Sequence, residues 1–322
     1  MSEATQFYIL TLLIFFAVDL LACWALNLQF GVTGVLNFAF VVFQGVGAYT
    51  VALLTLGPAS NNGGFQKYIF GMQLPFPLPL IAAGIAGALA SFLVGVVVLR
   101  RLRRDYQAIV MLVVSLIATN IAENQVSLVN GSSGLVLIPK PLESTLDLPT
   151  IQYQWLYALF ALSLCAVVYF IIHRLTSSPL GRSLRAVRDN EKVLASTGRN
   201  PMKLQMMVMM VGGAIAAVSG GLLAAFLGAW GPTSWLFPTT FLYLTAVLIG
   251  GPGNNTGVIL GALLIPTVLH EATRFLPEFG FPGMSEALQW VLIGVLMLVF
   301  IWYRPQGLLP EKPGRVAEVA GG

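Results

Sequence analysis

Charged residues are scarce in this sequence, and cysteine and histidine are scarcer still. Asp, Glu, Lys and Arg make up 9% of its 322 residues, whereas hydrophobic residues make up 57%. A water-soluble protein of this length cannot cover its surface with so few charged side chains, which excludes soluble enzymes and regulatory domains. The formal net charge of +4 is explained by basic loops beside a membrane and predicts no nucleic-acid partner.

The residue patterns that carry most enzyme chemistry are also missing. Cys23 and Cys165 lie far apart in apolar segments, and His173 and His270 are the only histidines. This is too few for a disulfide framework or a metal site, so we expect no metal and no cofactor. The sequence contains no GxxxxGK(S/T) loop and no HExxH pair, which excludes nucleotide binding by a phosphate loop and zinc hydrolase chemistry. We therefore expect that the chain is not an enzyme.

Long hydrophobic runs take up most of the sequence instead. The clearest extends from Leu204 to Ala229 without one charged residue. A membrane-spanning helix needs roughly 20 apolar residues, and lipid offers the backbone no hydrogen-bond partner outside the helix. We therefore predict an all-α, polytopic membrane bundle, a single domain over residues 1–322 with about eight to ten spans. The predicted spans are about 7–28, 33–56, 77–100, 107–129, 154–173, 204–229, 236–250, 256–273 and 286–303.

Basic residues indicate how the spans are oriented. They gather at 100–104 after the third span, at 174–203 after the fifth, and at 304–315 after the last. Loops rich in Lys and Arg stay on the cytoplasmic side of a membrane. This pattern predicts an N-terminus outside the cell and a cytoplasmic C-terminal tail, residues 304–322.

Two parts of the hydrophobic pattern are interrupted. The stretch 31–56 holds four glycines, and the short run 236–250 ends in GGPGNNTG, residues 250–257. Interrupted helices occur in membranes where the irregular backbone is buried in protein or lines a cavity. They are typical of transporters, and both 31–56 and 236–273 are open to a re-entrant path. Small residues at four-residue spacing, over 87–95 and 213–225, predict close helix packing.

One long loop, about residues 175–203, separates the fifth and sixth spans. Leu184, Val187 and Leu194 recur at helical spacing, which predicts one amphipathic helix over 181–198 along the cytoplasmic face. Such a helix either binds anionic lipid or docks in a protein groove. Its acidic residues and the helix breakers on both sides favour docking. The candidate docking residues are Gly181, Arg182, Arg185, Arg188, Asp189, Glu191, Lys192 and Gly198.

Polar side chains within the spans are further candidates for function. An ionisable group at mid-membrane costs on the order of 3 kcal/mol. We interpret Asp19 as structural, satisfied by a neighbour such as Asn27 or by another subunit. Asn120 and Glu123 are open to two interpretations, a solvated helix end or the outer mouth of a transport pathway. The interrupted second span adds three candidates for lining a pathway, Phe40, Phe43 and Gln44.

Six motifs, in order along the chain, resemble the LivM-type permease family of branched-chain amino acid ABC importers. They are GVTGVLNFAFVVFQGVGAYTVALL (31–54), RLRRDYQAIVMLVVS (101–115), NGSSGL (130–135), GRSLRAVRDNEKVLASTG (181–198), VLIGGPGNNTGVILGALL (247–264) and YRPQGLL (303–309). The resemblance covers about residues 30–310, and it assigns the 181–198 motif to the cytoplasmic loop that contacts an ATPase in that family.

The resemblance implies a permease subunit of the bacterial inner membrane without an ATPase of its own. It implies a second, homologous permease subunit in a heterodimer, two ATP-binding cassette subunits and an extracytoplasmic substrate-binding protein. This chain has Ala39-Phe40 where the family usually has a Gly-His pair, and relatives also serve urea, amides and aromatic acids. The substrate class is therefore open between branched-chain amino acids and such small solutes. A secondary transporter driven by an ion gradient is the alternative.

Overall fold

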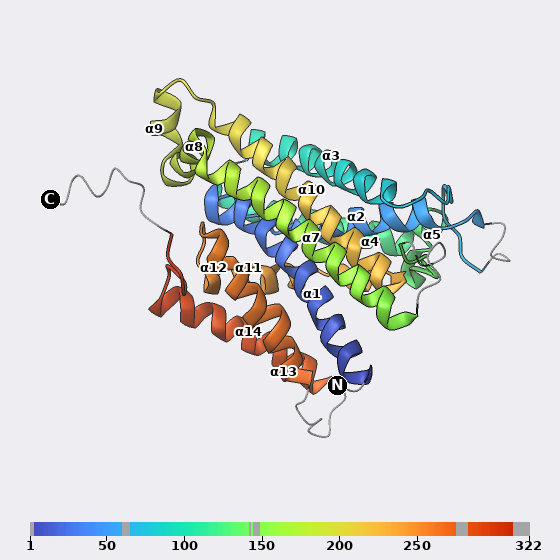
Figure 1. The fold of residues 1–322 in the computed structure, drawn as a ribbon. Coiled ribbons are helices and arrows are strands. Elements are labelled where there is room, and N and C mark those ends of the chain that lie inside the picture. Colours follow the sequence, from blue (N-terminus) through green and yellow to red (C-terminus); the bar gives the residue numbers. More distant parts are fainter. Residues whose placement is uncertain are drawn as a thin grey trace.

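Each predicted span is helical in the computed structural model, which describes residues 3–59, 65–102, 104–141, 143, 149–274 and 283–311. Within these ranges, eight helical segments are long and apolar enough to cross a membrane, and α2 is a shorter apolar helix. Figure 1 shows them as a bundle of long, tilted helices. The prediction of an all-α, polytopic membrane bundle is confirmed.

The elements follow one another along the chain in this order. The first half of the described chain contains α1 (Glu3–Asn27), the π-helical turn η1 (Leu28–Val32), α2 (Phe40–Thr55), α3 (Leu78–Arg101), α4 (Arg104–Asn124), α5 (Val126–Val129), η3 (Gly131–Ser133) and strand β1 (Leu135–Val136). The second half contains α7 (Thr150–Ser177), α8 (Pro179–Asp189), α9 (Glu191–Ser196), α10 (Pro201–Leu227), β2 (Ala229–Trp230), η4 (Pro232–Trp235), α11 (Pro238–Gly250), α12 (Asn255–Ala262), η5 (Leu263–Leu269), α13 (His270–Arg274) and α14 (Met284–Tyr303). Strands β1 and β2 pair antiparallel, with Leu135 opposite Trp230.

Two predicted spans differ from the observed helices. The second begins at Phe40, seven residues later than the predicted start at 33, because the chain leaves the π-helical turn at Val32 in an irregular conformation. The fourth ends at Asn124, because Gln125 has a non-helical backbone (φ −89°, ψ 74°) that separates α4 from α5. The 16 residues of α2 give a helix of about 24 Å, which is shorter than the roughly 30 Å hydrocarbon core of a bilayer.

Small residues set the spacing at the centre of the bundle, where α10 packs against α2 and α3. A Cβ atom added to Gly47 of α2 would lie 1.9 Å from the carbonyl oxygen of Ala217 in α10. One added to Gly87 of α3 would lie 2.5 Å from the carbonyl oxygen of Gly213. These backbones touch because no side chain separates them. The predicted packing role of the small-residue rows is confirmed.

The late glycine-rich segment is a tight turn between two antiparallel helices. Helix α11 ends at Gly250, and α12 begins at Asn255, where Asn254 accepts a hydrogen bond from the backbone N–H of Thr256. Beyond α12, the helix widens into the π-helical segment η5, which contains Pro266. The predicted break at 250–257 is confirmed.

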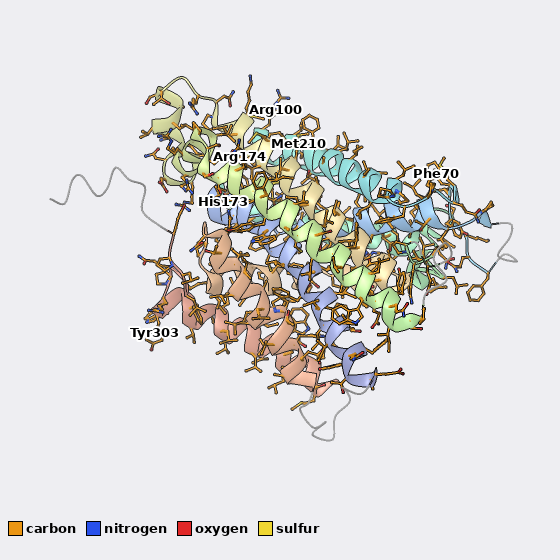
Figure 2. The ribbon with its side chains drawn as sticks, in the orientation of Figure 1. Phe70, Arg100, His173, Arg174, Met210 and Tyr303 are labelled. Carbon is orange, nitrogen blue, oxygen red and sulfur yellow. The ribbon has the colours of Figure 1, made fainter. Side chains whose placement is uncertain are left out.

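The basic clusters that follow α3 and α7 lie at one end of the bundle. Figure 2 shows Arg100 and Arg174 at the end that carries α8 and α9, and Phe70 at the opposite end. We call the first of these the basic end. Of the predicted basic clusters, residue 103 and residues 312–315 lie outside the described residues.

Candidate functional site

Two short helices, α8 and α9, form the long loop at the basic end. Helix α8 begins after Ser178, whose hydroxyl accepts a hydrogen bond from the backbone N–H of Gly181 at 3.4 Å. Asn190 ends it with an extended backbone (φ −159°, ψ 104°) and caps α9 through its side-chain oxygen. The prediction of one continuous helix over 181–198 is therefore wrong. Asparagine competes with the helix as an N-cap, and a new helix begins there.

The apolar face of α8 packs on the chain's own bundle. Leu184 and Val187 are fully buried, and Leu184 forms a small cluster with Leu28, Val32 and Val208. Gly181 lies directly against the end of α7, since a Cβ there would be 2.1 Å from the carbonyl oxygen of Thr176. The apolar stripe thus fixes α8 to α7, η1 and α10.

The charged residues of the loop divide into two groups by exposure. Arg182, Asp189 and Lys192 are exposed, whereas Arg185, Arg188 and Glu191 are partly buried. Glu191 accepts a hydrogen bond from the side-chain amide of Gln205 at 2.7 Å. Gly198 follows α9 with a left-handed backbone (φ 81°). The first group offers charge to solvent, although Asp189 also accepts a hydrogen bond from Nε of Arg188 at 3.4 Å. The second group is engaged within the chain.

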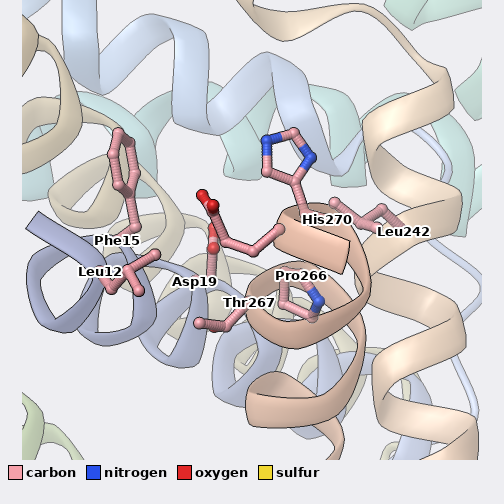
Figure 3. A pocket seen from close by; sticks show the side chains of 8 residues that line it. Leu12, Phe15, Asp19, Leu242, Pro266, Thr267 and His270 are labelled. Atoms are coloured by element: carbon pink, nitrogen blue, oxygen red, sulfur yellow. The ribbon is translucent and has the colours of Figure 1, made fainter. Parts of the chain in front are cut away.

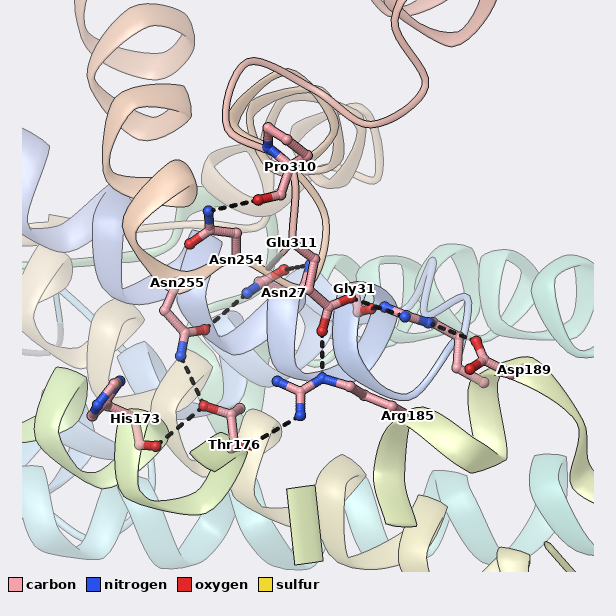
Figure 4. A network of polar contacts seen from close by, with 12 residues as sticks. Asn27, Gly31, His173, Thr176, Arg185, Asp189, Asn254, Asn255, Pro310 and Glu311 are labelled. Atoms are coloured by element: carbon pink, nitrogen blue, oxygen red, sulfur yellow. Dashed lines mark hydrogen bonds and ion pairs between the residues drawn. The ribbon is translucent and has the colours of Figure 1, made fainter. Parts of the chain in front are cut away.

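Arg185 and Arg188 both bind the carboxylate of Glu311, as Figure 4 shows for Arg185. The Nε atom of Arg185 pairs with Oε1, and Nη2 of Arg188 lies 2.9 Å from Oε2. Arg185 also donates to the carbonyl oxygen of Thr176 at 3.2 Å, and Arg188 donates to that of Gly31. These bonds connect α8 to α7, η1 and the C-terminal segment. Charge-assisted bonds to a carboxylate are stronger than neutral ones.

A buried amide network lies next to this ion pair (Figure 4). The side-chain oxygen of Asn27 accepts from the N–H of Gly253 at 2.8 Å, and its amide donates to Asn255 at 3.1 Å. Asn255 in turn donates to the hydroxyl of Thr176 at 3.1 Å, and its carbonyl oxygen accepts from Trp24 at 2.9 Å. The network joins α1, α7 and the start of α12.

The segment 307–311 is paired with the turn 250–254 along its backbone. Leu308 donates to the carbonyl oxygen of Ile249 at 2.7 Å, and Leu309 donates to that of Gly250 at 3.2 Å. The side chain of Asn254 donates to the carbonyl oxygen of Leu309 at 3.1 Å. Gly251 has φ 118° and leaves no room for a Cβ, which would lie 2.2 Å from the Leu309 oxygen. These contacts hold Glu311 in a defined position.

The candidate pathway residues fall in two different environments. Phe40 and Phe43 are fully buried and Gln44 is 3% exposed. The amide of Gln44 donates to Ser219 at 3.1 Å and to Tyr243 at 3.2 Å, so these three residues pack inside the described chain. Asn120 is exposed and Glu123 partly exposed on α4. A groove of about 370 Å³ that includes Asn120 runs along that helix.

Asp19 lies at a cavity of about 380 Å³ between α1 and the η5–α13 helix (Figure 3). Its carboxylate accepts a hydrogen bond from the hydroxyl of Tyr243 at 3.2 Å. Thr267 and His270 line the opposite wall. The partner of Asp19 is thus Tyr243 and not Asn27. Among the described residues, no three His, Cys, Asp or Glu side chains gather as a metal site would require.

Sequence reasoning missed Glu311, Asn27, Thr176 and Asn255 as members of the site at the basic end. Asn27 carried a usable signal, because an amide among apolar residues at the end of a span needs a partner. Glu311 carried none, since 126 residues separate it from Arg185. Its role follows from the fold alone.

The chain matches the family model for the permease component of branched-chain amino acid transport systems over residues 8–301. It belongs to this family. The predicted class, a transmembrane permease subunit of an importer without its own ATPase, is confirmed. The chain is 31% identical to a probable branched-chain amino acid transport permease protein LivM of Methanocaldococcus jannaschii, over 94% of this chain and 93% of the relative.

Two further relatives differ in type. The chain is 33% identical to the high-affinity branched-chain amino acid transport system permease protein LivM of Escherichia coli, over 88% of this chain and 66% of the relative. It is 25% identical to the LivH permease of the same transport system in that organism, over 88% of both chains. No solved structure matches the chain. It is therefore related to two kinds of permease subunit and more similar to the LivM kind.

Proposed function

We propose that this permease imports branched-chain amino acids, or a related small amino-acid-like solute, across the bacterial inner membrane. It would pair with a LivH-like second permease and work with two ATP-binding cassette subunits and an extracytoplasmic binding protein. The observation that carries the proposal is the loop α8–α9, anchored to the bundle on one face and charged on the other. The family membership supports a transport system with two related permeases.

The ATPase subunits would bind the exposed face of α8 and α9. Arg182, Asp189 and Lys192 offer both signs of charge there, which suits a protein surface better than anionic lipid alone. Closure of the ATPase pair on ATP would then displace α8, and the contacts of α8 with α7, η1 and α10 would pass this movement into the bundle. The basic end would accordingly face the cytoplasm, with the N-terminus outside and the C-terminus inside.

The solute pathway would lie between the two permeases. The exposed face of α4 with Asn120 and Glu123 is the candidate for its outer mouth, because amide and acidic side chains on an otherwise apolar membrane face need polar neighbours. Phe40, Phe43 and Gln44 would reach the pathway only in a conformation in which α2 separates from α10 and α11. Alternating access of this kind requires such rearrangements.

The test is uptake by the reconstituted complex. The chain is copurified with its partners from native membranes, placed in vesicles with the binding protein outside, and supplied with ATP inside. We expect leucine, isoleucine or valine uptake that needs ATP, stops with vanadate and ignores ionophores. Competition by urea, short amides or aromatic amino acids identifies a different substrate class. Uptake by the chain alone, without ATP but abolished by ionophores, would identify a secondary transporter.

A further inference from the structure

Glu311 joins α8 to the C-terminal segment that pairs with the turn 250–254. Its carboxylate takes one arginine of α8 on each oxygen, Arg185 on Oε1 and Arg188 on Oε2. The side chain of Arg185 is 33% exposed, that of Arg188 is 29% exposed and that of Glu311 is 20% exposed. In this partly buried cluster, each oxygen of one carboxylate pairs with a different arginine. Such a cluster fixes the positions of its side chains better than an isolated ion pair on the surface does.

The backbone that carries Glu311 is fixed to the turn between α11 and α12. Leu308 and Leu309 pair with Ile249 and Gly250, and Asn254 donates to the carbonyl oxygens of Leu309 and Pro310 at 3.1 and 3.3 Å. The fit around the carboxylate is close as well. A Cβ added to Gly253 would lie 2.7 Å from Oε2 of Glu311 and 3.1 Å from Nη1 of Arg188. Glu311 is therefore a charged link between α8 and this turn, beside the neutral hydrogen bonds of Asn27 and Asn255.

We propose that Glu311 is a positioning residue for transport, which links the movement of α8 to the turn 250–254 and so to α11 and α12. The proposal rests on the proposed function of α8 as the ATPase-contacting helix. Arg185 and Arg188 would bind Glu311 and would not contact the ATPase. Without the carboxylate, α8 keeps its apolar anchor on α7, η1 and α10, but only neutral contacts, such as the hydrogen bonds Asn255–Thr176 and Gly253–Asn27, still connect this part of the bundle to the α11–α12 hairpin. ATP hydrolysis would then continue, but fewer solute molecules would be transported for each ATP hydrolysed.

The decisive variant is Glu311→Gln, which keeps the size of the side chain and removes its charge. In reconstituted complex we expect solute transported per ATP to fall on the order of tenfold, with ATPase activity and subunit composition close to those of the unmodified complex. Glu286→Gln is the matched control, because Glu286 is an exposed acid in the first turn of α14. It should leave the transport-to-ATP ratio unchanged.

A second measurement does not depend on transport. Hydrogen exchange of the purified complex should show faster exchange in α8 and in residues 249–254 of Glu311→Gln, with α3 unchanged. Unchanged exchange, or an unchanged transport-to-ATP ratio, overturns the proposal. Loss of the ATPase subunits from the Glu311→Gln complex also overturns it, because Glu311 would then act in docking. An unmodified complex without ATP-driven uptake instead overturns the proposed function itself.

Discussion

The hydroxyl of Tyr243 holds the carboxylate of Asp19 within the membrane-spanning part of α1. Tyr243 is 3% exposed, donates to Asp19 at 3.2 Å and accepts from Gln44 at 3.2 Å. Tyr243→Phe removes the hydroxyl at nearly constant volume, so Asp19 and Gln44 each lose their hydrogen bond to it. We expect the free energy of unfolding to fall by about 1–3 kcal/mol, because a buried polar group without its partner keeps its desolvation cost. Thermal unfolding of the purified chain in detergent measures the change.

Tyr8→Phe is the control for this prediction. The hydroxyl of Tyr8 donates to the carboxylate of Glu271 at 2.8 Å, but Tyr8 is 38% exposed. Water can replace the lost hydrogen bond at such an exposed position, so the free energy of unfolding should change by no more than about 0.5 kcal/mol. Equal losses for the two variants would contradict the structural role assigned to Tyr243. The sequence indicated that Asp19 needs a partner, but Tyr243 is 224 residues away, a separation that local patterns do not bridge.

At the scale of elements, the contact between α3 and α10 depends on the absence of side chains. Gly87→Ala places a Cβ 2.5 Å from the carbonyl oxygen of Gly213. The helices must separate to accept it, and overpacking of this kind costs about 1–3 kcal/mol. Gly294→Ala in α14 is the control, since a Cβ there meets nothing within 4 Å. It should stabilise the helix by up to about 1 kcal/mol. A lower unfolding temperature for Gly294→Ala than for Gly87→Ala would contradict this account.

Spacing in the sequence predicted this contact, because small residues four positions apart lie on one helix face. It did not predict where α8 ends. Leu184, Val187 and Leu194 keep a helical period across Asn190. The extended backbone and the capping bonds of Asn190 show that two helices replace one. The π-helical segments η1 and η5 also escaped prediction. One extra residue per turn leaves no clear trace in an apolar sequence, although Pro266 is compatible with it.

For the whole molecule, the structure separates the charges of the loop by exposure and by partner. The double variant Arg182→Glu, Lys192→Glu reverses the charge of two basic side chains on the exposed face of α8 and α9. We expect fewer ATPase subunits to copurify with it. The loss should be larger at low salt, because salt screens the repulsion between exposed charges. Arg185→Gln with Arg188→Gln removes the partners of Glu311. That pair should retain the ATPase subunits and lower the amount of solute transported per ATP.

The two double variants form a comparison within one loop, since each removes two basic side chains from the same helix pair. Subunit stoichiometry after affinity purification reports docking, and the transport-to-ATP ratio in vesicles reports coupling. Membrane insertion should be the same for both, because neither pair lies in a spanning segment. Equal loss of ATPase subunits from both variants would show that all four side chains contact the ATPase, and the division into an outer and an inner group would then be wrong.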